Sequence, residues 1–168
     1  VQSAQVERIL RESEERYHAL FENAAFGVFR TLPEGRFLKV NTAFARMLGY
    51  DSSDEMISSV RDVSSDIYLI PGSRTKVLGE ITQRRGWGIF EECFRRKDGS
   101  VFFVKLHIRP VYGPDNDFQY LEGFVEDITE KKRTEEAIRR DQELKEKILQ
   151  TAGVAIAFGM ECFEEELI

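Results

Sequence analysis

The sequence has few cysteines and no long apolar run. Cys93 and Cys162 form neither a CxxC pair nor a Cys/His spacing typical of metal sites, so we expect a reduced, cytoplasmic chain. The longest apolar run, residues 152–158, has seven residues, far below the roughly 20 that a membrane helix needs. No secretory signal is recognisable at the start. We expect no membrane contact from these residues, and a membrane segment of a parent protein would lie outside them.

Excess positive charge and catalytic motifs are also missing. The chain carries 24 Lys and Arg against 30 Asp and Glu, a net charge of -6, and no basic cluster stands apart from acids. This balance argues against nucleic acid as a partner. There is no phosphate loop, nucleophile elbow or HExxH, and no Ser or Cys motif is placed to use His18 or His107. We expect no catalytic residue and no metal site in this sequence.

The chain does contain enough apolar residues for one domain. Of its 168 residues 42% are apolar and 32% charged, with 13 Phe, which is typical of one globular domain with long solvated stretches. Residues 1–22 predict an amphipathic helix, because apolar side chains recur at steps of three and four. Four of these residues are candidates for a dimer contact: Val6, Ile9, Leu10 and Tyr17.

The next segments alternate strands and helices. Residues 26–31 and 36–40 predict two strands joined by a turn at residues 33–35. Asn41 is a good N-cap for a short helix that Gly49 ends. Residues 51–71 predict short helical turns or loops. Ser73 is a candidate cap for a helix that places Val77, Leu78 and Ile81 on one face and is closed by Gly86.

Three strands follow, over residues 87–97, 101–112 and 118–127. The first two are joined by Asp98–Gly99, a strong hairpin turn. In the second, apolar side chains from Phe102 to Ile108 share one face, while Lys105, His107 and Arg109 share the other. We expect the latter face to be polar and either accessible or covered by the N-terminal helix. This order of elements predicts an α+β domain on an antiparallel sheet.

A charged helix is expected over residues 130–150. Of the 18 residues from Glu130 to Lys147, 13 are charged, and they form acid-to-base pairs four residues apart. A thin apolar seam of Ala137, Leu144 and Ile148 suggests a coiled coil that contributes to a dimer. The alternative is a solvated single helix, because the seam is sparse.

Three segments make the family recognisable: residues 41–50 (NTAFARMLGY), 95–101 (RRKDGSV) and 121–132 (LEGFVEDITEKK). Together, in this order, residues 17–133 resemble a PAS domain with its PAC motif, from a multi-domain bacterial or archaeal signalling protein. The resemblance implies a five-stranded antiparallel sheet with helices on one face, enclosing a small cavity, within a core at residues 23–129. It also implies a sensory role, with a histidine kinase as the parent's output or, less favoured, a cyclic-dinucleotide enzyme.

The tail shows an internal likeness. Residues 148–157 (ILQTAGVAIA) resemble residues 20–29 (LFENAAFGVF), and Leu167–Ile168 corresponds roughly to Phe37–Leu38. We therefore expect residues 151–168 to be the truncated start of a second PAS domain, with a strand over residues 154–158. The alternative is a C-terminal strand that packs on this domain.

The resemblance also indicates which cofactors to consider. Haem-sensing relatives take a histidine from the helix before the sheet strands, and residues 73–85 contain none. Light-sensing relatives use an Asn-Cys-Arg motif, and residues 51–85 contain no cysteine. His-ligated haem and a Cys-adduct flavin are therefore disfavoured, and the cofactor stays unknown. Cys93 is interpreted as a core residue or free thiol.

A small-molecule ligand in the core is compatible with the resemblance, and a core packed without a void is the alternative. Nine apolar residues are the pocket candidates: Val28, Phe44, Leu48, Val77, Ile81, Val104, Leu106, Ile108 and Val125. Asp127, Ile128 and Thr129 are the expected signal exit, where Asp127 or Thr129 can cap the following helix. The competing interpretation is a ligand-free dimerisation module.

Overall fold

The computed structural model describes the backbone of residues 1–165 and the side chains of residues 1–158. It divides into two units, Val1–Ile128 and the residues from Thr129 onward. The helices of the first unit are α1 (Gln2–Glu22), α2 (Thr42–Met47), α3 (Ser53–Ser59), α4 (Val63–Asp66) and α5 (Ser73–Arg84). Its strands are β1 (Gly27–Thr31), β2 (Phe37–Val40), β3 (Gly88–Arg95), β4 (Val101–Tyr112) and β5 (Phe118–Asp127). The second unit is the helix α6 (Thr129–Glu165).

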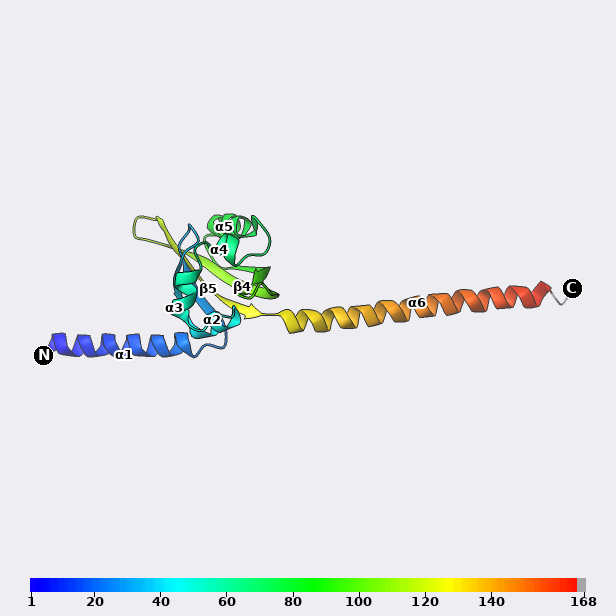
Figure 1. Ribbon diagram of the computed structural model, residues 1–168, viewed down its shortest axis with the longest axis horizontal. Coiled ribbons are helices and arrows are strands. Elements are labelled where there is room, and N and C mark those ends of the chain that lie inside the picture. The colour runs from blue at the N-terminus through cyan, green and yellow to red at the C-terminus, as the bar shows by residue number, and fades with distance from the viewer. Residues whose placement is uncertain (166–168) are drawn as a thin grey trace. The chain divides into compact units, whose positions relative to one another are not determined.

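The five strands form one sheet in the order β2-β1-β5-β4-β3, and every neighbouring pair is antiparallel. Helices α2 to α5 lie on one face of this sheet (Figure 1). The predicted α+β fold with a five-stranded antiparallel sheet is therefore confirmed. Strands β4 and β5 have the predicted bounds, and the other three begin or end within two residues of them.

The core lies between the sheet and these helices. On β4, the side chains of Phe102, Val104, Leu106 and Ile108 are all buried, whereas their odd-numbered neighbours are exposed or half-buried. The alternation follows from the pleat, which directs successive side chains to opposite faces. Strand β1 departs from the prediction. Phe29 is buried in the core, and Val28 lies on the opposite, outer face.

The starts of helices α2 and α5 test the predicted capping residues. Asn41 caps α2 as predicted, because its side-chain oxygen accepts from the backbone N–H of Phe44. Ser73 does not cap α5: Gly72 occupies the cap position with a left-handed φ of 80°, and the Ser73 hydroxyl donates to Glu92 at 2.6 Å. The helix ends at Arg84, and Arg85, rather than Gly86, takes the left-handed conformation.

A short segment before α5 extends the sheet beyond β3. The N–H of Leu69 donates to the Cys93 carbonyl at 2.9 Å, and the N–H of Arg95 donates to the Ile67 carbonyl at 2.8 Å. Tyr68 forms an isolated bridge with Phe94. Residues 67–69 therefore cover part of the outer edge of β3.

Helix α6 corrects the expectation for the tail. Residues 154–158 belong to this continuous helix, so the strand predicted there is wrong. A strand needs a partner to bond its N–H and C=O groups, whereas a helix bonds them within its own segment. The Glu136–Arg140 and Asp141–Lys145 pairs form as predicted. The assignment of residues 151–168 to a second domain stays a prediction, and its residues 167–168 lie outside the described part of the chain.

Candidate sensory core and signal exit

A small cavity lies between the sheet and helices α2, α4 and α5. Its volume is about 20 Å³, room for roughly one water molecule. Four of the predicted pocket residues line it: Phe44, Val77, Leu106 and Ile108. Four others are buried in the surrounding core without lining it: Leu48, Ile81, Val104 and Val125. Val28 is the exception, because β1 turns it to the outer face of the sheet.

The cavity has a polar side that the sequence did not predict. Thr31, Tyr68 and Arg74 line it and are 3%, 5% and 6% exposed. The guanidinium of Arg74 donates to the carbonyl oxygens of Pro33 and Leu32, both at 3.0 Å. Burial lowers the pKa of Arg74 and raises that of Tyr68, because it disfavours the charged form of each. Arg74 therefore ties α5 to the β1–β2 turn beside the cavity.

The spacing of residues along α5 indicates that Arg74 lies on the face that packs on the core. Arg74, Val77, Leu78 and Ile81 are separated by three, one and three residues, so they lie on the same face of α5. The apolar members of this set were predicted to be buried. The charged member is not predicted to be buried, because arginine is seldom fully buried without a partner.

The predicted signal exit is bonded to α2 through one arginine. Arg96, the residue after β3, donates from Nε to the Met47 carbonyl at 3.0 Å and from an Nη to Asp127 at 3.1 Å. Its guanidinium lies over the Phe102 ring, 4.0 Å from the centroid. Ile128 is buried, and its N–H donates to the Phe103 carbonyl at 2.9 Å. Thr129 is the first residue of α6. Asp127 and Ile128 are therefore the two exit residues that belong to the first unit.

The neighbouring residue, Lys97, strengthens the same junction. Its N–H donates to the Leu48 carbonyl at 2.9 Å, and its side chain pairs with Glu55 at the start of α3. The hydrogen bond with Lys97 lowers the pKa of Glu55 and raises that of Lys97. The β3–β4 hairpin is therefore attached to α2 at two consecutive backbone carbonyls, those of Met47 and Leu48.

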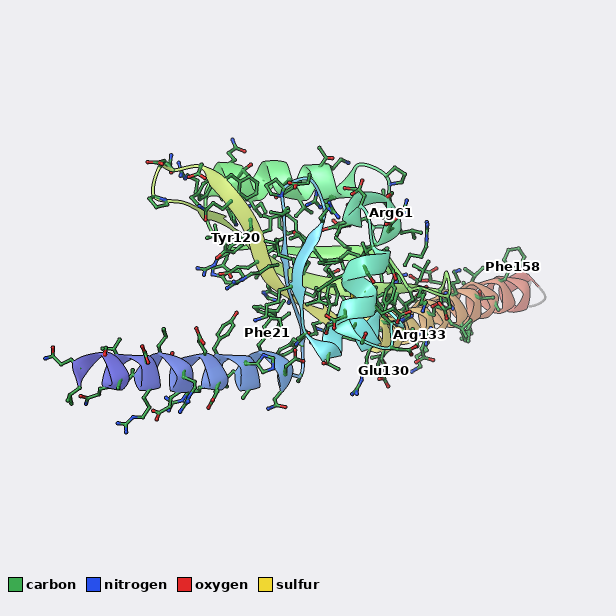
Figure 2. The ribbon with its side chains drawn as sticks, turned by 60° about the vertical axis from the view of Figure 1, so that its left-hand side comes forward. Phe21, Arg61, Tyr120, Glu130, Arg133 and Phe158 are labelled. Atoms are coloured by element: carbon green, nitrogen blue, oxygen red, sulfur yellow. The ribbon has the colours of Figure 1, made fainter. Side chains whose placement is uncertain are left out.

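The outer face of the sheet is less polar than predicted. His107 lies on this face, as expected, and its ring stacks on Phe124 with 4.3 Å between centroids. Phe26 and Trp87 also contact Phe124, and Arg30 lies over the ring of Tyr120, which is labelled on β5 in Figure 2. The expectation of a polar face is therefore met in part: Lys105, His107 and Arg109 lie on it as predicted, and aromatic rings lie among them.

The residues predicted to form dimer contacts are accessible. Val6, Ile9, Leu10 and Tyr17 on α1 are 47–63% exposed. On α6, Leu144 and Ile148 are 57% and 58% exposed, and Ala137 is exposed. The C-terminal part of α1 contacts the sheet: the Tyr17 hydroxyl accepts from Arg30 at 3.4 Å, and Phe21 is 5% exposed (Figure 2). The dimer contact stays a prediction for both helices.

The described residues bear on two expectations, metal binding and membrane insertion. Within them, no group of three or more His, Cys, Asp and Glu side chains is arranged to hold a metal ion. None of the helices, so far as they are described, is both long and apolar enough to cross a membrane. Cys93 lies half-buried on β3, and the Cys162 side chain is outside the described residues.

This fold defines a class of sensory domain. The family model of the PAS fold matches residues 15–128, and the chain belongs to this family. The crystal structure of the PAS domain of an HTR-like protein from Haloarcula marismortui is similar, with a TM-score of 0.59 and 24% identity, covering 74% of this chain and 99% of that one.

The curated relatives are longer signalling proteins. Sensor histidine kinase TmoS from Ectopseudomonas mendocina is 30% identical over 138 residues, which cover 80% of this chain and 14% of the relative. Probable diguanylate cyclase DgcE from Escherichia coli is 26% identical over 145 residues, which cover 83% of this chain and 12% of the relative. The chain therefore spans less than a sixth of the length of either relative.

Proposed function

We propose that this chain is the sensory and signal-transmitting PAS domain of a multi-domain signalling protein, and that it relays the state of its core to α6. The observation that supports the relay is the position of Arg96, which bonds both the end of α2 and the last residue of β5. The Arg96 side chain thereby contacts both α2, which lines the cavity, and Asp127, the first residue of the expected exit.

The route can be followed from the cavity outward. Phe44 lines the cavity from α2, and the Met47 carbonyl at the end of α2 accepts from Arg96. Arg96 pairs with Asp127, and Thr129 begins α6 two residues later. A shift of α2 that displaces the Met47 carbonyl would move Arg96, because both of its polar contacts share one planar guanidinium. Asp127 would then gain or lose a charged partner beside the start of α6.

The output of the parent protein is inferred from its relatives. TmoS is named a sensor histidine kinase, and DgcE a probable diguanylate cyclase. We favour a histidine kinase, since TmoS has the higher identity of the two. Fold alone does not determine output, because one fold serves many functions.

A second function is favoured by the size of the cavity. About 20 Å³ accommodates roughly one water molecule, which is the size expected of a normally packed core. The domain would then be a ligand-free interaction module that responds to a partner. Native mass spectrometry and an absorption spectrum of the purified chain separate the two functions. A copurifying small molecule supports ligand sensing, and a colourless, ligand-free chain supports the interaction module.

Hydrogen exchange tests the relay, which both functions require. Arg96→Met removes both polar contacts and keeps an apolar stem over Phe102. We expect faster exchange at the amides of residues 133–138, in the first turns of α6, because Asp127 loses its contact with Arg96. Lys97→Met is the matched control: it removes the pair with Glu55 and leaves the Arg96–Asp127 contact in place.

A core substitution completes this test. Phe44→Leu reduces a side chain that lines the cavity, and it should change exchange at residues 133–138 in the wild-type chain. The same substitution should change it much less when Arg96 is already Met, since the connecting contact is gone. Equal changes in the two backgrounds, or equal effects of Arg96→Met and Lys97→Met, would contradict the relay.

A further inference from the structure

Tyr68 lies between the core cavity and the surface of the domain. Its side chain is 5% exposed and lines the cavity of about 20 Å³. It also lines a surface hollow of about 370 Å³, together with Ser64, Leu69 and Gly72. Its ring lies 4.9 Å from the Phe94 ring, and among the described residues no group is hydrogen-bonded to its hydroxyl. Packing therefore holds this side chain between the two spaces.

The segment that carries Tyr68, residues 67–73, lies along the edge of β3. Three hydrogen bonds join the segment to this strand: two backbone bonds made by residues 67–69, and the bond from the Ser73 hydroxyl to Glu92 at 2.6 Å. A segment joined to a sheet edge in this way opens locally at a lower free energy than unfolding of the whole domain requires. Opening would withdraw the Tyr68 ring from the cavity.

The charged side chains along this route have one sign. Arg74 lines the cavity, and Arg95 lines the hollow. Within the described part of the chain no acid lines either space, and none forms an ion pair with Arg74. Asp62 and Glu34 act on the Arg74 charge from farther away. A guanidinium has more N–H donors than its two bonds to the β1–β2 turn use, so an anion can accept the others.

We propose that Tyr68 is a gate to the core and that Arg74 selects what passes it. Residues 67–73 open away from β3, the Tyr68 ring moves from the cavity into the hollow, and a small organic anion enters. The cavity then grows by the volume of an aromatic ring, and a cavity of roughly 150 Å³ holds a molecule the size of benzene. This inference rests on the proposed sensory function, to which it adds an entry route and the charge of the ligand.

The accessibility of a cysteine at the cavity measures the gate. The full chain first receives Cys93→Ser and Cys162→Ser. Val77→Cys then adds a thiol in the lining of the cavity, and Val125→Cys adds one in the core outside this lining. We expect a methanethiosulfonate reagent to label Val77→Cys at least about tenfold faster than Val125→Cys, because local opening is more frequent than global unfolding. Equal rates would overturn the gate, since global unfolding would then expose both thiols.

Three further variants test whether the opening occurs at the segment of Tyr68. Ser73→Ala removes the bond to Glu92 and should raise the ratio of the Val77→Cys rate to the Val125→Cys rate about fivefold, the effect of one hydrogen bond of ordinary net strength. Tyr68→Ala removes the ring and should raise this ratio further. Ser52→Ala, the matched control, removes the exposed cap of α3 and should leave the ratio unchanged. A ratio that Ser73→Ala does not raise would overturn the proposal.

The charge of the reagent tests the role of Arg74. An anionic sulfonatoethyl reagent should label Val77→Cys at least about threefold faster than a cationic trimethylammonium reagent, with each rate divided by its rate at the same thiol in the urea-unfolded chain. Arg74→Met should abolish this preference. Equal normalised rates, or faster labelling by the cation, would overturn the selection of anions. Labelling does not depend on the relay, which hydrogen exchange at residues 133–138 measures, so the gate and the proposed function can fail separately.

Discussion

The Asn41 side chain donates from Nδ2 to the Phe21 carbonyl at 2.9 Å, which bonds the start of α2 to the end of α1. The same nitrogen donates to the Phe26 carbonyl at 2.9 Å. Its Oδ1 accepts from the N–H groups of Val28 and Phe44 at 2.9 and 3.0 Å. Asn41 is fully buried, so one amide satisfies four backbone groups from α1, the α1–β1 link, β1 and α2.

Asn41→Ala should destabilise the domain strongly. It leaves two N–H groups and two carbonyls without their partner, and each unsatisfied buried group costs about 1 to 3 kcal/mol. We expect a loss of about 3 kcal/mol or more in the free energy of unfolding, measured by urea denaturation. Ser52→Ala removes the exposed cap of α3 and should cost only about 0.5 to 2 kcal/mol. Equal losses would contradict this interpretation of Asn41.

Gly123→Ala should break the pairing of β4 with β5. A Cβ at Gly123 would lie 2.1 Å from the backbone oxygen of His107, and backbone cannot move aside as a flexible side chain can. We expect the variant to be largely unfolded at room temperature by circular dichroism. Gly79→Ala, within α5, meets no atom within 4 Å and should stabilise the helix by about 0.5 to 1 kcal/mol. A stable Gly123→Ala domain would mean that β4 and β5 can separate.

Glu22 should make stability depend on acid pH. Its carboxylate accepts from the Thr42 hydroxyl at 2.6 Å and from the Thr42 N–H at 3.1 Å. The hydroxyl bond, first of all, lowers the pKa of Glu22 below its ordinary value, with a smaller effect of His18 and Lys39. Its contribution is therefore complete above the unfolded-state pKa and lost as the pH falls through the folded-state pKa. Urea midpoints of wild type and Glu22→Gln should differ at neutral pH and converge in acid. A constant difference would exclude this carboxylate as the cause.

Deleting residues 151–168 should leave the unfolding midpoint of the core nearly unchanged. Val154, Ile156 and Phe158 are 64–69% exposed on α6, so their removal uncovers no core surface. Solubility should improve if anything, because exposed apolar side chains promote association. Thermal unfolding followed by circular dichroism is the measurement. A fall of several degrees would show that the tail supports this domain.

Much of the sheet could be predicted because its signals are local and repeated. Strand β4 alternates over residues 101–110. The Asp98–Gly99 turn, in which Gly99 has a φ of 85°, fixes the pairing of β4 with β3. Strand β1 has only five residues, with Val28 and Phe29 both apolar. Such a strand does not reveal which parity faces the core, and the pairing with β5 determines it instead.

The remaining site residues depend on contacts distant in the chain. Arg74 is buried because the carbonyls of Leu32 and Pro33, about 40 residues earlier, accept its guanidinium. The role of Arg96 likewise requires Met47 and Asp127 to meet across three elements. Spacing along the sequence does not indicate which residues bond to Arg74 or to Arg96. The exit at Asp127 was recognisable from its motif, whereas the arginine that holds it was visible only in the fold.

Residues 67–69, which bond to the free edge of β3, bear on how this domain would meet a copy of itself or a similar domain nearby. An unpaired strand edge is a template onto which another copy can add its own strand, and neighbouring domains on a single polypeptide face each other at very high local concentration. Here the carbonyl of Cys93 and the N–H of Arg95 are already occupied. That half of β3 therefore cannot use these two backbone groups to pair with a strand of a neighbouring domain. This reduces the strand exchange and misassembly that occur in tandem arrays.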